Sequence, residues 1–201
     1  MIVYLDLDRT LFRTENTLDI WFEVSQLFPQ VDAPREYNSR DDFLYHVGDL
    51  SYHDFSAQLR KLDIDPVAAY EQLIETDLAN GRFEFPGVKE LVESLKAHGA
   101  DVRILTFGQD DFQRFKVALC PSLTDLQVVT TMRPKYEYLE ATEEECWVVD
   151  DKAIGDELPS SASFVQVSLE GEVIDDDAQW PVFYNLFDVK EFFDDVFDES
   201  D

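Results

Sequence analysis

The sequence predicts an α/β fold in which helices sandwich a parallel β-sheet, with an all-helical segment inserted after the first strand. Short apolar runs of β-favouring residues alternate with amphipathic helical patterns from residue 85 onwards, as expected for strands that are buried on both faces. Residues 13–84 show only helical periodicity. We therefore expect a core formed by residues 1–12 and 85–201 and a helical insertion formed by residues 13–84.

The first predicted strand covers residues 2–5 and ends in two carboxylates, Asp6 and Asp8, with Thr10 beyond them. Two carboxylates at the end of a buried strand are unfavourable unless a partner offsets their charge, and Mg²⁺, which prefers oxygen ligands, is a suitable partner. In such an arrangement Asp6 can attack a phosphorus atom and Asp8 can protonate the leaving oxygen. The alternative is an ordinary acidic turn, because aspartate is abundant throughout this chain.

The insertion is predicted to consist of helices joined by loops. Apolar residues recur at helical spacing over residues 18–28, 51–62 and 66–78. A further short helix is expected over residues 41–47. Residues 31–38, which contain a proline, are expected to form a loop.

The remaining core alternates helices and strands. This alternation favours a Rossmann-like parallel sheet, in which ligands bind beyond the carboxyl ends of the strands. The acidic residues 175–179 are expected to form a loop and residues 199–201 to fray. The predicted strands cover residues 102–106, 126–130, 146–149 and 164–167, and the predicted helices cover residues 86–98, 109–119, 135–141 and 189–197.

Composition limits the partners and the location. The chain has 201 residues, a formal net charge of -28 and a hydrophobic fraction of 45%. A protein with this much negative charge repels nucleic acids and anionic membranes. No apolar run in the sequence is long enough to cross a membrane. Cys120 and Cys146 lie far apart, which fits a reducing compartment better than a disulfide framework. Because no basic leader precedes the first strand, we expect a cytoplasmic protein.

Polar residues follow several of the predicted strands. Each has an ordinary explanation when it is taken alone: a helix cap, a solvated lysine or an acidic loop. Together they supply a nucleophile, an acid, a metal clamp and donors for phosphoryl oxygens, which are the parts that phosphoryl transfer needs. In chain order they are Asp6 and Asp8, Thr106, Lys135, and Asp150 and Asp151 with Asp156 beyond them.

This ordered set resembles the motifs of the haloacid dehalogenase superfamily with a helical cap inserted after the first motif. Asp6-Leu7-Asp8-Arg9-Thr10 resembles the first motif, and Ile104-Leu105-Thr106-Phe107-Gly108 resembles the second. Lys135 is placed like the third motif, and Val148-Val149-Asp150-Asp151 resembles the fourth. The resemblance spans nearly the whole chain but does not specify the cap or the substrate pocket.

The resemblance implies a magnesium-dependent phosphatase that hydrolyses a small phosphomonoester through an aspartyl-phosphate intermediate. By this resemblance Asp6 is the nucleophile, and Asp8 is first the general acid and then the general base for the hydrolytic water. The phosphoryl oxygens would be held by Thr106, Gly108 and Lys135. The expected partner is a small phosphorylated metabolite, and the expected assembly is a monomer or a homodimer.

The resemblance also implies one Mg²⁺ site. The ion would lie between the Asp6 carboxylate, the backbone carbonyl of Asp8 and an acidic residue of the fourth motif. Asp151 is favoured as that ligand because Asp156 follows it at a spacing the superfamily uses, while Asp150 would assist or replace it.

The chain departs from the superfamily pattern at two places. Arg9 stands where members commonly have glycine, and it would be strained if the turn required a positive φ. Lys135 follows a proline rather than preceding one, so Lys152 is an alternative for the phosphate-binding lysine.

Three other functions compete with the phosphatase. A dehalogenase of the same superfamily is disfavoured by Asp8, since a halide leaving group needs no proton. A phosphomutase would keep the phosphoenzyme rather than hydrolyse it, and a non-catalytic acidic binding protein would use the fold without turnover. In each enzyme the insertion of residues 13–84 would close over the site and select the substrate, with Arg13 beside its mouth.

Overall fold

The structure, a computed structural model, describes residues 1–48, 50–142, 144–171 and 178–199. Of the segments considered above, residues 175–177 of the acidic loop and residues 200–201 of the C-terminus lie outside these described residues. Among the described residues, no helix combines the length and apolar character that a membrane span needs.

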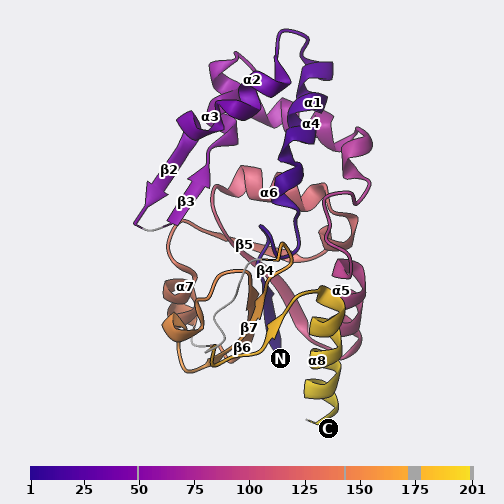
Figure 1. Ribbon diagram of the computed structural model, residues 1–201, viewed down its shortest axis with the longest axis vertical. Helices are drawn as coiled ribbons and strands as arrows, with labels where there is room; N and C mark the ends of the chain where they lie inside the picture. The colour runs from indigo at the N-terminus through magenta and orange to yellow at the C-terminus, as the bar shows by residue number, and fades with distance from the viewer. Residues whose placement is uncertain (49, 143, 172–177, 200–201) are drawn as a thin grey trace.

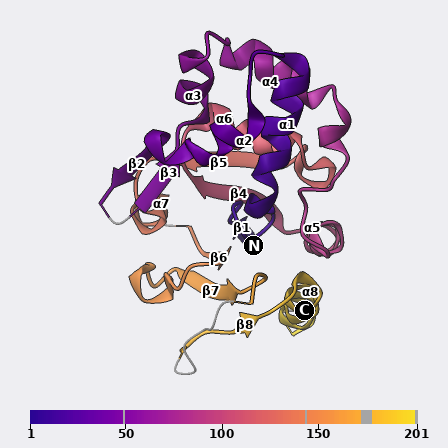
Figure 2. The ribbon, with the colours of Figure 1, turned by 45° about the horizontal axis from the view of Figure 1, so that its top comes forward.

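The core of the described chain, which lies below the insertion in Figure 1, is one sheet whose neighbouring strands all pair in parallel. Their order is β5-β4-β1-β6-β7-β8 (Figure 2). The central strand β1 pairs with β4 on one side and with β6 on the other. Parallel neighbours bring their carboxyl ends to a common edge. The strands are β1 (Ile2–Leu5), β4 (Asp101–Phe107), β5 (Gln127–Thr131), β6 (Cys146–Asp150), β7 (Ala162–Val167) and β8 (Val182–Phe183).

Helices cover both faces of the sheet, as predicted. The helices α5 and α8 lie side by side on one face, and α7 lies on the other (Figure 2). Because side chains alternate along a strand, Val3 and Leu5 of β1 join the apolar cluster that includes α5 and α8, while Tyr4 joins Leu139 of α7. The core helices are α5 (Val88–Ala97), α6 (Asp110–Ala118), α7 (Lys135–Thr142) and α8 (Leu186–Asp198).

Every strand predicted from the sequence is present, and one strand of this parallel sheet was missed. Strand β8 is only two residues long and follows Pro181, so it is too short to show any periodicity. Short 3₁₀ helices complete the connections. They are Thr14–Asn16, Arg40–Phe43, Asp77–Ala79, Pro121–Leu123 and Gly155–Glu157.

The prediction of an all-helical insertion is wrong. Residues Leu44–Val47 (β2) and Leu50–His53 (β3) form an antiparallel hairpin where helices were expected over residues 41–47 and 51–62. Gly48, at a φ of 59°, allows the chain to turn, and the flanking valine and tyrosine side chains favour strands. All four residues of β2 are exposed, so this segment has no buried face that could stabilise a helix.

A second correction concerns residues 31–38, which were expected to form a loop. Ala33–Asn38 form helix α2, and the carboxylate of Asp32 caps it by accepting a hydrogen bond from the Arg35 amide at 3.1 Å. Pro34 lies in the first turn, where a proline is compatible with a helix. The other helices of the insertion are α1 (Thr17–Leu27), α3 (Phe55–Lys61) and α4 (Pro66–Ile74).

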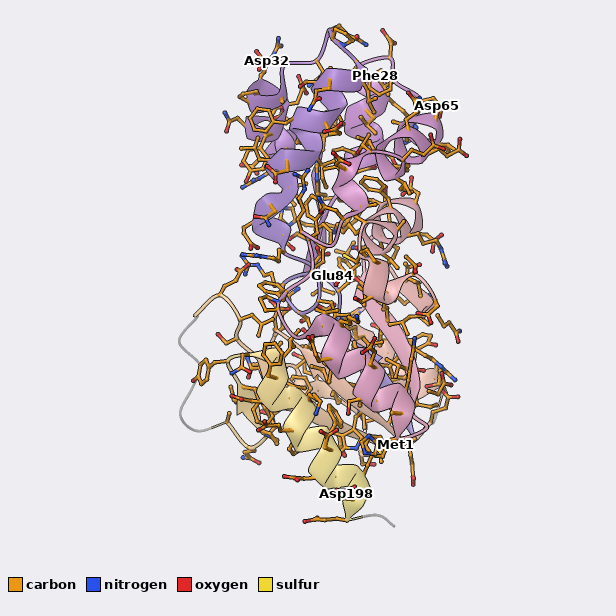
Figure 3. The ribbon with its side chains drawn as sticks, turned by 90° about the vertical axis from the view of Figure 1, so that its right-hand side faces the viewer. Met1, Phe28, Asp32, Asp65, Glu84 and Asp198 are labelled. Carbon is orange, nitrogen blue, oxygen red and sulfur yellow. The ribbon has the colours of Figure 1, made fainter. Side chains whose placement is uncertain are left out.

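The chain leaves the core for the insertion and returns from it through two connecting segments that run side by side. The Arg13 amide donates to the Phe83 carbonyl at 2.7 Å, and the rings of Phe12 and Phe83 stack with centroids 5.1 Å apart. Figure 3 shows Glu84 at this narrow junction, with Phe28 and Asp65 at the far end of the insertion and Met1 at the opposite end of the core.

Beyond this junction, the insertion packs against the core through helix α6. Phe55 of α3 stacks on Phe112 at 4.9 Å, and Tyr70 of α4 stacks on Phe115 at 4.6 Å. The Ser56 hydroxyl lies 2.5 Å from a carboxylate oxygen of Asp111. The insertion and this side of the sheet therefore share one apolar cluster.

Candidate active site

The predicted polar residues converge at the carboxyl ends of β1, β4 and β6. Asp6 follows β1, Thr106 lies near the end of β4, and Asp150 ends β6 with Asp151 immediately after it. Lys135 begins helix α7 and points back to the same edge. All five line a pocket of about 1170 Å³ beneath the insertion.

Lys135 joins two of these carboxylates. Its ammonium lies 2.5 Å from Oδ1 of Asp6 and 2.5 Å from Oδ2 of Asp150. All three side chains are almost fully buried. One oxygen each from Asp6, Asp150 and Asp151 lie within 4.8 Å of one another. We refer to these four residues as the Asp6 group.

The Asp6 group has more negative charge than its lysine can offset. Burial raises the pKa of Asp6 to about 6, with Asp150 adding to the effect and Lys135 opposing it. Burial, followed by the charges of Asp6 and Asp150, raises the pKa of Asp151 to about 8. Burial alone would lower the pKa of Lys135, but the two carboxylates it contacts raise it above its ordinary value.

A divalent cation fits this group. Three carboxylates and one ammonium leave a formal charge of -2 when all are ionised. Carboxylate oxygens are the ligands that Mg²⁺ prefers. The carboxylates of Asp6, Asp150 and Asp151 would hold the ion, whereas the carboxylate of Asp8 does not belong to this cluster.

Asp8 is held by a separate set of donors, which we call the Asp8 group. The Lys116 ammonium lies 2.8 and 2.7 Å from the two carboxylate oxygens of Asp8. The Thr14 hydroxyl donates to Asp8 at 3.0 Å and the Gln113 amide at 3.3 Å. The aliphatic stem of Lys116 is enclosed, and its ammonium lies 4.5 Å from the centroid of the Phe112 ring.

These donors determine the charge of Asp8. Burial would raise the pKa of Asp8, but the Lys116 ammonium and the hydrogen bonds from Thr14 and Gln113 outweigh it, so the pKa lies below its ordinary value. Asp8 is therefore ionised in this arrangement. An ionised carboxylate can accept a proton, as a general base does, but it has none to donate.

The structure shows a packing role for Gly108, while its binding of phosphate stays a prediction. Its amide donates to the Thr131 carbonyl at 3.0 Å, and Gly108 is not among the residues that line the pocket. A Cβ at this position would lie 2.5 Å from the side-chain amide nitrogen of Gln113. Gly108, at a φ of 139°, therefore makes room for Gln113, whose amide also donates to the Phe107 carbonyl at 2.8 Å.

The structure also gives the surroundings of Arg9, Lys152 and Asp156, about which the sequence left questions open. Arg9 does adopt a positive φ, 63°, in the turn after Asp8. Lys135, and not Lys152, joins Asp6 to Asp150, although Lys152 lines the pocket. Asp156 is exposed and does not belong to the carboxylate cluster.

Sequence reasoning missed Lys116 and Gln113. Both lie on helix α6, and a charged residue in a helical pattern is usually solvated. A signal was nevertheless present, because Lys116 lies four residues after Phe112 and therefore on the apolar face of the predicted helix.

No protein-family model matches this sequence, and no curated protein matches it either. Solved structures resemble the fold along its whole length. A protein described as a haloacid dehalogenase-like hydrolase from Burkholderia xenovorans has a TM-score of 0.65 at 18% identity, covering 96% of this chain and 97% of its own. A HAD phosphatase from Thermococcus onnurineus has a TM-score of 0.63 at 17% identity, with coverage of 96% and 97%.

A third structure, YfnB from Bacillus subtilis, was solved with bound magnesium and has a TM-score of 0.56 at 12% identity, with coverage of 95% and 97%. At these identities the likeness concerns the fold. The chain therefore has the fold of the haloacid dehalogenase-like hydrolases.

Proposed function

We propose that this protein is a magnesium-dependent phosphatase that hydrolyses a small phosphomonoester through an aspartyl-phosphate on Asp6. The observation that carries the proposal is the Asp6 group: a buried carboxylate paired with a buried lysine, beside two further carboxylates at the ligand-binding edge of a parallel sheet. Bound Mg²⁺ would neutralise charge on the transferring phosphoryl group and offset the carboxylates that hold it.

In the first step, an oxygen of Asp6 attacks the phosphorus and the bond to the leaving oxygen breaks. Lys135 already contacts Asp6, so its ammonium is placed to stabilise the phosphoryl oxygens as negative charge develops on them. The Thr106 side chain, buried at the end of β4, is the second predicted donor to these oxygens.

In the second step, Asp8 takes a proton from water while the water oxygen bonds to phosphorus and the bond to Asp6 breaks. The ionised state of Asp8 suits this role as a base. In the first step the leaving oxygen needs a proton, and Asp8 can supply it only after taking one up as the substrate binds. The Lys116 ion pair favours the ionised carboxylate. Asp8 therefore suits the second step, in which it accepts a proton, better than the first step, in which it must donate one.

Two enzyme alternatives share this fold, since one similar structure is described as a β-phosphoglucomutase and another as a dehalogenase. A phosphomutase returns its phosphoryl group to a second substrate hydroxyl, so it releases little inorganic phosphate. A dehalogenase would act on a carbon–halogen bond and would not release phosphate. A non-catalytic acidic binding protein would show no turnover with either substrate class.

The remaining expectations are part of the same proposal. A small phosphorylated metabolite is the partner that a phosphoryl-transfer site of this size suits, and a cytoplasmic monomer or homodimer rests on the sequence argument alone. The magnesium contact through the Asp8 carbonyl likewise stays a prediction, because the carboxylate cluster involves side chains only.

The test is release of inorganic phosphate from a panel of phosphomonoesters, with Mg²⁺ and with a chelator. We expect turnover only with Mg²⁺, and Asp6→Asn should abolish it while leaving the thermal unfolding transition in place. Asp195→Asn is the matched control, because Asp195 is exposed and outside the pocket. Full activity of Asp6→Asn, or full activity in the chelator, would reject the proposed mechanism.

A further inference from the structure

We propose that the substrate is the phosphomonoester of an uncharged alcohol that carries an aromatic ring, and that the β2–β3 hairpin and the end of β4 form the wall that binds the ring. This inference rests on the proposed phosphatase function and adds the substrate class. It is carried by the side chains that line the outer part of the pocket, away from the Asp6 group.

The first observation is an aromatic wall next to the phosphate end of the pocket. Tyr52 of β3 meets Phe107 edge to face, with ring centroids 6.1 Å apart, and both residues line the pocket. Phe107 directly follows Thr106, so this wall begins one residue from a predicted phosphate donor. Tyr45 stacks on Tyr52 at 5.6 Å, which fixes the orientation of the Tyr52 ring.

The rest of this wall is also largely apolar. Leu44, Leu50 and Tyr136 line the same pocket. Ligand pockets ordinarily occupy about 300–1,000 Å³, so a pocket of about 1170 Å³ has room for a ring-sized group in addition to the phosphate. An aromatic group would gain by packing on Tyr52 and Phe107, since aromatic pairs are favourable beyond the area that they bury.

The second observation is the charge of the outer pocket. Its two arginines lie beside carboxylates of the same pocket, with Arg9 3.5 Å from Glu170 and Arg40 3.9 Å from Asp41. Arg40 also lies over the Tyr37 ring, 4.4 Å from its centroid.

Three further carboxylates line this region; Glu15 is paired with Arg13 at 3.0 Å, and Lys152 is the remaining lysine of the lining outside the Asp6 and Asp8 groups. Glu15, Glu140 and Glu157 all face the pocket, and the protein as a whole has a net charge of -28. A second anionic group on the substrate, such as a carboxylate, would meet repulsion here. An uncharged ring meets none, so both observations select the same substrate class.

The experiment compares kcat/KM for three esters of primary alcohols: 2-phenylethyl phosphate, glucose 6-phosphate and 3-phosphoglycerate. Because all three have similar leaving groups, differences in kcat/KM report recognition of the rest of the molecule. We expect 2-phenylethyl phosphate to exceed 3-phosphoglycerate by at least tenfold and to exceed glucose 6-phosphate by a smaller factor.

Two variants assign the preference to residues. Tyr52→Leu should lower kcat/KM for 2-phenylethyl phosphate about tenfold and for glucose 6-phosphate by less. Tyr184→Leu, which changes an exposed tyrosine outside the pocket, should change neither. The double variant Glu140→Gln with Glu157→Gln should raise kcat/KM for 3-phosphoglycerate several-fold, whereas Glu145→Gln, outside the pocket, should not.

The outcomes separate this inference from the proposed function. Phosphate release with equal or better use of 3-phosphoglycerate, or an unchanged substrate preference in Tyr52→Leu, would overturn the inference and leave the phosphatase standing. Absence of phosphate release from every ester tested would overturn both.

Discussion

Asp6 and Asp8 lie two residues apart after the first strand, yet their surroundings shift their pKa values in opposite directions. Asp6 shares one lysine with Asp150 and lies close to Asp151, and the pKa of Asp6 is raised to about 6. Asp8 has Lys116 to itself and two further donors, and its pKa is lowered despite burial. One group is short of positive charge, and the other is fully compensated.

This difference indicates where a cation and where a proton would act. A deficit of two charges at the Asp6 group is what a divalent metal removes, so the raised pKa values mark a site that gains stability from an ion. The Asp8 group needs no ion. Its donors instead hold a carboxylate that lines the same pocket, where an ionised oxygen can accept a proton from water.

Among the residues that compensate Asp6 and Asp8, removing the lysine of the Asp6 group should have the largest effect. Lys135→Met should lower kcat about 10²- to 10³-fold, because it removes a donor to the phosphoryl oxygens. It should also make folding more dependent on Mg²⁺, since three carboxylates would remain without an ammonium. Steady-state kinetics and melting temperatures over a Mg²⁺ titration measure both effects.

The control for this variant is Lys152→Met, which removes a pocket lysine that does not bridge Asp6 and Asp150. We expect a loss well below tenfold. If the two variants lost activity equally, the geometry would have misassigned the phosphate lysine.

Lys116→Met tests the Asp8 group, and its main effect should be on the free energy of unfolding. It leaves the part-buried carboxylate of Asp8 without its cation, which should cost about 1–3 kcal/mol of unfolding free energy. Adding Asp8→Asn to Lys116→Met should recover much of that loss without restoring activity. Urea unfolding of the two variants gives the comparison, and an additive double variant would show that the pair does not interact.

The two groups also predict opposite responses of stability to pH. For Asp151, burial and the nearby carboxylates raise the folded-state pKa from 3.8 to about 8, so its contribution to stability is present at low pH and is lost as pH rises towards 8. The lowered pKa of Asp8 gives the reverse, a contribution present at neutral pH and lost as pH falls below its ordinary pKa.

Mg²⁺ should remove the first of these effects and leave the second. The increase in melting temperature on adding Mg²⁺ should therefore be larger at pH 8 than at pH 5, as measured by thermal unfolding in matched buffers. A shift that is independent of pH, or larger at pH 5, would contradict the carboxylate cluster as the metal site.

The Asp6 group was predictable from the sequence and the Asp8 group was not, for a topological reason. Parallel strands bring residues that end β1 and β6 to one edge, so Asp6 and Asp150 could be placed together from strand patterns alone. Lys116 reaches Asp8 from the last turn of helix α6, and its reach depends on how α6 packs against the turn that carries Asp8. That packing involves aromatic contacts with the insertion, such as Phe112 with Phe55, which no periodicity specifies.

The prediction of an all-helical insertion was wrong for a related reason. Residues 44–53 carry apolar residues that fit either a helix or a strand, and the turn at Gly48 with the valine and tyrosine side chains beside it favours the hairpin. The sequence pattern therefore predicts the sheet and its ligand-binding edge, but it does not predict the elements that pack on the sheet through side chains.

The smallest expected effect compares two threonines that occupy matching places in the two groups. The Thr10 hydroxyl donates to Asp6 at 3.3 Å, and the Thr14 hydroxyl donates to Asp8 at 3.0 Å. Thr14→Val should cost about 1 kcal/mol of stability and should move the acidic limb of the pH–kcat profile upwards, because Asp8 loses a donor that favours its charged form. Thr10→Val should leave that limb in place, since Thr10 does not contact Asp8. If both variants moved the acidic limb equally, Asp6 and Asp8 would titrate as one unit, and the division into two groups would fail.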